Sequence, residues 1–146
     1  KVMSTFNTRC PACQGVNRVP SERVSESPTC GKCKAPLLDG APVEGTSVNF
    51  STLLNSDQPV VVDFWATWCN PCVGFAPVFS DVAAERNGNV RFVKINTEEQ
   101  QQLAAQFAIR SIPTVMVFKQ GKVVDTINGA LPKGQFDQWL NQALTK

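Results

Sequence analysis

The C-terminal two thirds of the chain alternate between strand-like and helix-like spacing of hydrophobic residues. Residues 60–65 (VVVDFW) form a continuous apolar run rich in β-branched side chains, which predicts a strand buried on both faces. Residues 90–96 (VRFVKIN) alternate between apolar and polar side chains, as a second strand does. Residues 114–119 and 122–128 predict two further strands, and Gln120-Gly121 between them is typical of a hairpin turn.

Four other segments are predicted to be helical, namely 49–55, 71–86, 97–107 and 132–144. Pro77 lies inside the second of these and is expected to kink it, because proline removes a backbone donor. Thr97 is a suitable N-cap for the third, and Gln100 completes a capping-box pattern. From residue 60 onward the order is β-α-β-α-β-β-α, which predicts an α/β fold whose mixed sheet has a parallel part and an antiparallel hairpin at one edge.

The N-terminal part of the chain follows neither period. Residues 5–38 are rich in Pro, Ser, Arg and Gly, and so short a segment cannot bury a useful core of its own. It therefore needs covalent or metal cross-links if it folds. Turn-forming residues in 39–47 indicate a linker. The sequence thus predicts a small module at 5–38, a linker at 39–47 and an α/β domain at 48–146.

The composition excludes several classes of function. The chain has 146 residues, a net charge of +2, six cysteines and no histidine, so histidine-dependent catalysis and mixed Cys/His metal sites are excluded. Residues 1–34 carry six basic and two acidic side chains, which we interpret as solvated surface rather than a nucleic-acid-binding face. No apolar run is long enough to span a membrane. The polar N-terminus shows no secretory signal, which favours the cytoplasm unless a signal has already been removed.

Cys69 and Cys72 lie between the strand at 60–65 and the helix that they open. Two intervening residues allow both thiols to form a disulfide within one helical turn. The free N–H groups and partial positive charge of a helix N-terminus stabilise a thiolate and lower the pKa of the first cysteine. Cys69 is therefore the expected nucleophile, and Cys72 the thiol that resolves a mixed disulfide. A structural disulfide or half of a metal site is the alternative for such a pair.

Two further residues near this pair are unusual. Asp63 interrupts the buried apolar run six positions before Cys69, where burial would raise its pKa and let it accept the proton of Cys72. A strand-end aspartate that reaches solvent or caps a loop fits the pattern equally well. Pro113 could be cis and form a tight turn beside the site, although a trans proline at a strand start is more common.

The remaining cysteines, Cys10, Cys13, Cys30 and Cys33, form two more Cys-x-x-Cys pairs separated by 16 residues. This spacing is typical of a four-thiolate zinc site, in which each pair turns both sulfurs toward one ion. Four protein ligands leave no open coordination position, so we expect one structural zinc per chain. Its binding energy can fold a segment that lacks a core. An iron–sulfur or mononuclear iron site, two disulfides and four free thiols are the alternatives.

The motifs taken together resemble those of the thioredoxin family. Residues 48–146 share with it the order and spacing of five motifs, which are DFWATWCNPC at 63–72, FAP at 75–77, KIN at 94–96, SIPT at 111–114 and NGA at 128–130. With the N-terminal cysteine pairs, the chain resembles the zinc-containing bacterial subclass, thioredoxin 2. The resemblance implies a thioredoxin fold with a small zinc-ribbon-like module at its N-terminus.

The resemblance also implies roles for residues near the reactive cysteines. It implies that Asp63 is the buried proton acceptor beside Cys72, that Lys94 is its charge partner, and that Trp65 packs beside the site. It further implies that Pro113 is cis. The apolar patch on which a substrate chain docks would consist of Trp68, Pro71, Ile112, Pro113, Gly129 and Ala130.

The activity that the resemblance implies is reduction of disulfides in protein substrates, with electron transport from a flavin- and NADPH-dependent thioredoxin reductase. It implies a monomer that binds no organic cofactor itself. A second class of function stays open, in which the four-cysteine module recruits a partner or senses oxidants by releasing zinc. Intact Cys69 and Cys72 favour the reductase, because a recruitment platform needs neither thiol.

One position departs from the family pattern. The usual dipeptide between the two cysteines is Gly-Pro, whereas here it is Asn70-Pro71. Pro71 is generally associated with the reducing members, so the reductase interpretation is kept. We expect the Asn70 amide to donate a hydrogen bond to the Cys69 sulfur and to make the couple slightly less reducing. The competing interpretation is that Asn70 points to solvent.

Overall fold

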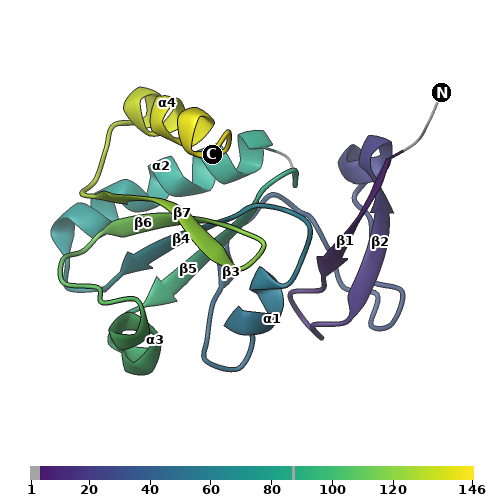
Figure 1. Cartoon of the computed structure of the whole chain (residues 1–146), viewed down its shortest axis with the longest axis horizontal. Helices are drawn as coiled ribbons and strands as arrows, with labels where there is room; N and C mark the ends of the chain where they lie inside the picture. The colour runs from purple at the N-terminus through teal and green to yellow at the C-terminus, as the bar shows by residue number, and fades with distance from the viewer. Residues whose placement is uncertain (1–3, 87) are drawn as a thin grey trace.

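The predicted sheet forms the centre of the structure, a computed structural model that describes residues 4–86 and 88–146. Four of its strands are those expected from the sequence: β4 (Val60–Trp65), β5 (Arg91–Asn96), β6 (Thr114–Lys119) and β7 (Lys122–Asn128). Strand β4 runs parallel to β5 and antiparallel to β6, and β6 and β7 form the edge hairpin (Figure 1). The mixed α/β sheet is therefore confirmed.

The fifth strand, β3 (Val43–Glu44), lies in the segment expected to be a linker, so part of 39–47 belongs to the sheet. It pairs parallel to β5, where Val43 is opposite Val93. Gly45 follows this strand, and a Cβ atom on it would lie 2.7 Å from Cγ1 of Val93. Only glycine permits so close an approach of the two strands. A two-residue strand is too short to show any hydrophobic period, which is why the sequence does not reveal it.

Helices cover both faces of the sheet (Figure 1). Helices α2 (Asn70–Arg86) and α4 (Lys133–Ala143) pack on one face, whereas α1 (Phe50–Leu54) and α3 (Gln101–Gln106) pack on the other. Helix α2 continues through Pro77. In the ranges 4–86 and 88–146, no helix combines the length and apolar character that crossing a membrane requires.

Helix α3 begins later than the capping-box pattern predicts, so that prediction is wrong. Asn96 Oδ1 accepts the backbone N–H of Glu98 at 2.9 Å, and the resulting turn replaces the expected first turn of helix. The Thr97 hydroxyl donates to the Trp65 carbonyl at 3.2 Å instead of capping a helix. Gln100 Oε1 accepts a backbone N–H from the loop before α1 at 3.0 Å. Both residues of the expected capping box therefore make tertiary contacts instead.

The N-terminal module, defined here as residues 5–38, lies beside α1 (Figure 1). Strands β1 (Thr5–Arg9) and β2 (Val16–Pro20) form an antiparallel hairpin, and a 3₁₀ helix, η1 (Ser21–Glu26), follows it. The module contains a small buried cluster that was not expected, formed by Cys10, Val19, Val24, Cys30, Leu37 and Leu38. Two of these six side chains are cysteines, so the apolar core remains too small to dispense with cross-links.

The two edges of the five-stranded sheet are short or irregular. Strand β3 contributes two residues to one edge. At the other edge, the pairing of β7 with β6 shifts its register between Val117 and Phe118, which is the mark of a β-bulge. Neither edge therefore presents a long, regular row of free backbone groups.

Candidate active site and four-cysteine centre

The two cysteines of the predicted active site lie where the loop after β4 enters α2. Cys69 directly precedes the helix, and its carbonyl accepts the N–H of Val73 at 3.0 Å. Cys69 and Cys72 form a disulfide, with their Cα atoms 5.2 Å apart. The backbone N–H of Cys72 donates to Cys69 Sγ at 3.2 Å. When the disulfide is reduced, this donor and the helix N-terminus favour a thiolate on Cys69.

The two sulfur-bearing side chains differ in access. Cys69 retains 5% of its surface and Cys72 only 1%, while the neighbouring Trp68 is 66% exposed. An incoming sulfur atom therefore meets Cys69 first. Trp65 and Ile112 pack against the disulfide from the protein side, as the family resemblance implies for Trp65.

The loop before β6 lies against the disulfide. Cys69 Sγ is 3.7 Å from the Ile112 carbonyl oxygen, and the Ile112–Pro113 peptide bond is cis. The Gly129 N–H donates to the Pro113 carbonyl at 2.8 Å, which holds the end of β7 beside this loop. The six residues expected to form the docking patch differ in exposure: Trp68, Pro71 and Ala130 are exposed, Ile112 and Gly129 are half-buried, and Pro113 is buried.

Asp63 lies on the sheet face covered by α2 and is fully buried. Neither of its two carboxylate oxygens has a hydrogen-bond partner. All other buried side-chain oxygen and nitrogen atoms in the described part of the chain have one. Burial raises the pKa of Asp63 to about 7, and the positive charge of Lys94 partly opposes this shift. The alternative of a solvent-reaching or loop-capping aspartate is therefore wrong.

Lys94 is the register neighbour of Asp63 on the adjacent strand. Its ammonium nitrogen lies 4.4 Å from the centre of the Trp65 ring, a cation–π contact, and is not hydrogen-bonded to the carboxylate. Lys94 therefore acts on Asp63 through its electric field and not through a direct ion pair. The structure thus brings Asp63, Lys94 and Trp65 together on the neighbouring strands β4 and β5, and Trp65 is the one of the three that packs against the disulfide.

The four N-terminal cysteines converge on one point. Their sulfur atoms all lie within 4.8 Å of one another. Two of these distances, Cys10 to Cys33 and Cys13 to Cys30, are 3.6 Å. Tetrahedral zinc with Zn–S bonds of about 2.3 Å requires sulfur atoms about 3.8 Å apart, so the arrangement fits zinc.

Backbone geometry explains why the sulfurs converge. Gln14 and Lys34, which follow the second cysteine of each pair, both adopt positive φ angles, 62° and 68°. Each allows the chain to turn sharply, so that the N–H groups inside the turn point at the first sulfur. N–H groups of Cys33, Asn17 and Lys32 lower the pKa of the Cys30 thiol, whereas burial and the neighbouring sulfurs raise the pKa of the Cys33 thiol.

Comparison with known proteins identifies the family to which this geometry belongs. The family model described as Thioredoxin matches residues 41–142, and the model described as Thioredoxin 2, N-terminal, matches residues 9–35. The chain belongs to the thioredoxin family. Thioredoxin C-3 of Corynebacterium nephridii is 44% identical over 136 residues, which cover 92% of this chain and 93% of the relative. Thioredoxin 1 of Nostoc sp. is 50% identical over 92 residues, which cover 63% and 86%.

Membership of the thioredoxin family makes the chain a thiol–disulfide oxidoreductase. The match to the thioredoxin 2 N-terminal model covers all four clustered cysteines, whose geometry is compatible with zinc. The chloroplastic Thioredoxin M-type of Chlamydomonas reinhardtii is also similar, 42% identical over 130 residues, which cover 86% of this chain and 93% of the relative.

The Asn70 hydrogen bond expected from the sequence is absent from the oxidised thioredoxin site that the structure describes. Asn70 is the first residue of α2 and is exposed. The Cys72 backbone N–H, rather than a side-chain amide, donates to Cys69 Sγ. A backbone donor fixed by the start of the helix needs no particular side chain at position 70, which supports the solvent-facing interpretation.

A set of buried polar residues away from the disulfide was not predicted from the sequence. Thr8, Gln58 and Arg91 are all buried where the N-terminal module meets the thioredoxin domain. The sequence did contain one indication that Arg91 is buried. Arg91 lies two positions before Val93 and four before Ile95 on one strand, so it points to the same face as these core residues. The sequence does not show which groups accept hydrogen bonds from the guanidinium.

Proposed function

We propose that this chain reduces disulfides in protein substrates with Cys69 and Cys72, and that a flavin- and NADPH-dependent thioredoxin reductase restores its dithiol. The observation that carries the proposal is the disulfide at the start of α2, where Cys69 lies beside the exposed Trp68 and Cys72 is enclosed. A structural disulfide gains nothing from such unequal access.

The reaction takes two thiol–disulfide exchanges. The Cys69 thiolate attacks one sulfur of the substrate disulfide, a bond forms to Cys69 Sγ, and the other substrate sulfur leaves as a thiolate. Cys72 then loses its proton and attacks Cys69 Sγ, which releases the second substrate sulfur. Two electrons pass from the dithiol to the substrate, and the product is the Cys69–Cys72 disulfide of the oxidised protein.

Asp63 is proposed to receive the proton of Cys72 in the second exchange. Burial raises its pKa to about 7, so that both the proton-accepting carboxylate and the acid form are accessible near neutral pH, as a general base requires. Lys94 is proposed to tune that pKa through its charge. The exposed or half-buried Trp68, Pro71, Ile112, Gly129 and Ala130, with buried Pro113 beneath them, are proposed to receive the substrate chain.

Turnover with a defined electron source tests this function. The chain, NADPH and a bacterial thioredoxin reductase are mixed with a disulfide-containing protein such as insulin, and NADPH consumption is followed. We expect consumption that depends on all three proteins. The chain can also be reduced chemically before it is mixed with the substrate. If it then reduces the substrate, but shows no turnover with NADPH and thioredoxin reductases from several sources, the proposed electron donor is contradicted and the disulfide chemistry is not.

We further propose that Cys10, Cys13, Cys30 and Cys33 hold one structural zinc ion, and that the protein works in a reducing compartment such as the cytoplasm, where these thiols stay reduced. Their sulfur geometry supports the zinc proposal. The bound metal would cross-link the two cysteine pairs, and with four protein ligands it offers no open position for chemistry.

Purified protein is therefore expected to contain about one zinc per chain, as a single four-thiolate site requires. The measurement is metal analysis after purification in reducing buffer, with Cys13→Ser as the variant expected to lose the metal. Absence of zinc, or stoichiometric iron in its place, would contradict the proposal. Zinc content measured again after mild peroxide treatment tests the alternative function, in which the module releases zinc on oxidation.

A further inference from the structure

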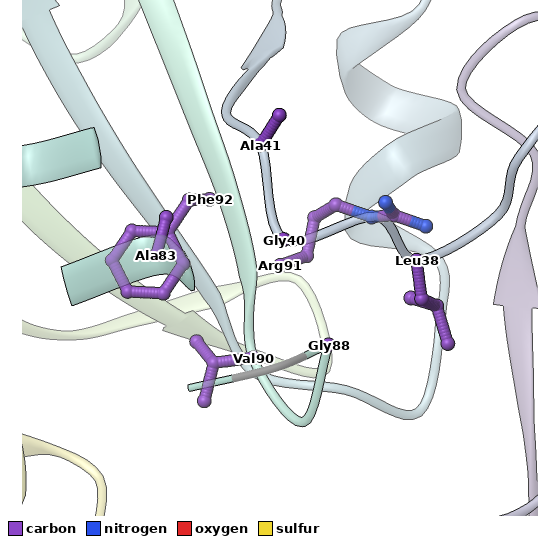
Figure 2. Close-up of a pocket in the computed structure, with 8 residues that line it drawn as sticks. All are labelled: Leu38, Gly40, Ala41, Ala83, Gly88, Val90, Arg91 and Phe92. Atoms are coloured by element: carbon purple, nitrogen blue, oxygen red, sulfur yellow. The ribbon is translucent and has the colours of Figure 1, made fainter. Parts of the chain in front are cut away.

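Arg91 lies at the first position of β5, yet its side chain belongs to the N-terminal module. The residue is 5% exposed. Its guanidinium donates to the carbonyl oxygens of Leu37 and Arg9, each at 2.9 Å, and to the Thr8 hydroxyl at 3.1 Å. Figure 2 shows the guanidinium pointing away from the sheet toward the segment that carries Leu38. All three side-chain bonds of this sheet residue therefore end in the module.

The acceptors of Arg91 flank the four-cysteine centre on both sides. Thr8 and Arg9 immediately precede Cys10, the first cysteine, and Leu37 follows Cys33, the last one, by four positions. Arg91 thus joins the segment that enters the centre to the segment that leaves it. A metal ion bound by both cysteine pairs would hold the same two segments at the same separation.

Other polar groups lie at the same junction, by which we mean the contact between the N-terminal module and the thioredoxin domain. Gln58, just before β4, accepts a hydrogen bond from Thr8 and donates one to the Gly88 carbonyl. Asp57 exchanges two bonds with the backbone of Asn7, at 2.7 Å and 2.9 Å. Apart from the Asp63 oxygens, each buried side-chain oxygen and nitrogen in the described part of the chain, including those of this network, has at least one hydrogen-bond partner.

The apolar contacts at the junction are tight as well. A Cβ atom on Gly88 would lie 2.9 Å from Cβ of Leu38 and 3.0 Å from Cγ1 of Val24, and Gly88 has a φ of 82°. The cavity beside it, drawn in Figure 2, measures about 10 Å³, which admits at most one water molecule. The module and the thioredoxin domain are therefore closely packed at Gly88, and a shift of one against the other would break these contacts.

Charge adds to this coupling. Four thiolates around one Zn²⁺ leave two net negative charges, and Cys10 is fully buried. Burial lowers the pKa of Arg91 to about 10, an effect that the nearby Asp39 and Cys10 oppose, so the guanidinium keeps its positive charge at neutral pH. The buried cation therefore bonds the chain directly beside Cys10, a ligand of a centre that would be anionic once it held zinc.

We propose that Arg91 couples zinc binding in the N-terminal module to the stability of the thioredoxin domain. This inference rests on the zinc site proposed above. Zinc and Arg91 favour the same arrangement of the two cysteine-bearing segments, so each strengthens the other. Coupling of this kind is reciprocal: zinc stabilises the domain to the extent that the docked domain tightens zinc.

The test compares Arg91→Met with a matched control, Arg86→Met, in the full chain. Arg86 also lies in the thioredoxin domain and is partly buried, but it bonds Asp137 and Asn141 of α4 instead of the module. Two readouts are made in the presence of a reductant. The first is transfer of zinc to a chromophoric chelator, and the second is thermal unfolding by tryptophan fluorescence. The second reports on the thioredoxin domain alone, because the chain's three tryptophans are Trp65, Trp68 and Trp139.

Removing zinc from the unmodified protein is expected to lower the unfolding temperature seen by tryptophan by about 5 °C. Arg91→Met should weaken zinc binding by about tenfold, the usual scale for residues just outside the ligands. It should also shrink the temperature shift caused by zinc removal. Arg86→Met should lower the unfolding temperature without changing the zinc affinity or the shift.

If Arg91→Met does not fold, Thr8→Val tests the same coupling from the module side and is expected to change both readouts in the same direction. Unchanged zinc affinity and an unchanged temperature shift in the Arg91 variant, or in Thr8→Val if that replaces it, would overturn the coupling. Protein without bound zinc at the outset would instead refute the zinc site itself, so the two failures are distinguishable.

Discussion

A Cys69→Ser variant is expected to lose all disulfide-reductase turnover and to form no covalent adduct with substrate. A Cys72→Ser variant should also lose turnover but keep the first exchange, since the Cys69 thiolate still attacks. Without the second thiol the mixed disulfide cannot resolve, so substrates stay linked to Cys69. Non-reducing electrophoresis and mass spectrometry of each variant after incubation with an oxidised protein substrate measure the adducts.

The unequal access of the two sulfurs is the structural reason for this asymmetry, because Cys69, which directly follows the exposed Trp68, retains more exposed surface than Cys72. The double variant Cys69→Ser/Cys72→Ser serves as the control and should trap nothing. Adducts that form on Cys72 in the Cys69→Ser variant would reverse the assigned roles. Equal trapping by both single variants would show that the enclosure of Cys72 does not restrict substrates.

Replacing Asp63 with asparagine should stabilise the oxidised protein by about 4 kcal/mol above pH 7. The carboxyl has a pKa near its ordinary 3.8 when unfolded and about 7 when folded, so the folded protein disfavours its charged form. Wild-type stability from this group therefore falls as the pH rises from about 4 to about 7. At about 1.4 kcal/mol per pKa unit, a shift of about three units gives the stated gain.

Urea unfolding of wild type and Asp63→Asn at several pH values measures this difference. It should be close to zero below about pH 3, where the carboxyl is neutral in both the folded and the unfolded protein, and largest above pH 7. Asp81→Asn, which removes a carboxylate from the exposed surface of α2, is the matched control and should show no such dependence. A stability difference that is constant across pH would indicate a change in packing instead of in ionisation.

The same Asp63→Asn variant should resolve mixed disulfides more slowly than wild type near neutral pH, because Cys72 loses its proton acceptor. The defect should shrink at higher pH, where Cys72 ionises unaided. Single-turnover kinetics with a preformed mixed disulfide isolate this step. A rate defect of equal size at every pH would contradict the role in proton transfer and leave the stability result unaffected.

Hydrophobic period was sufficient to predict the large elements of the fold, because each spans several repeats and buries a whole face. It failed where tertiary contacts outweigh local preference. The carbonyl of Trp65 takes the hydroxyl of Thr97 away from a helix cap, and β3 is too short for any period. The hairpin of β1 and β2 was not predicted because residues 5–38 show no strand-like hydrophobic period.

The candidate site was predictable to the extent that its chemistry lies in contiguous motifs. All three cysteine pairs have the same spacing, and the position of Cys69 and Cys72 between a predicted strand and helix distinguished that pair from the other two. The place of Asp63 in an apolar run left burial and a solvent-reaching position equally good, and the structure decides for burial. The position of the Lys94 ammonium over Trp65 could not be predicted from the sequence, since it depends on side-chain packing. The contacts of Arg91 reach residues 54 to 83 positions away, a separation at which sequence pattern carries no information.

The irregular edges of the sheet bear on how the protein meets its substrates. A disulfide reductase handles chains whose backbone groups are partly exposed, and a long free edge strand would invite those chains to add to the sheet and aggregate. Here β3 offers only two residues, and β7 is disrupted by its bulge and begins with the charged Lys122. Under the proposed function, a substrate is therefore expected to contact the protein around Cys69 rather than along an edge strand.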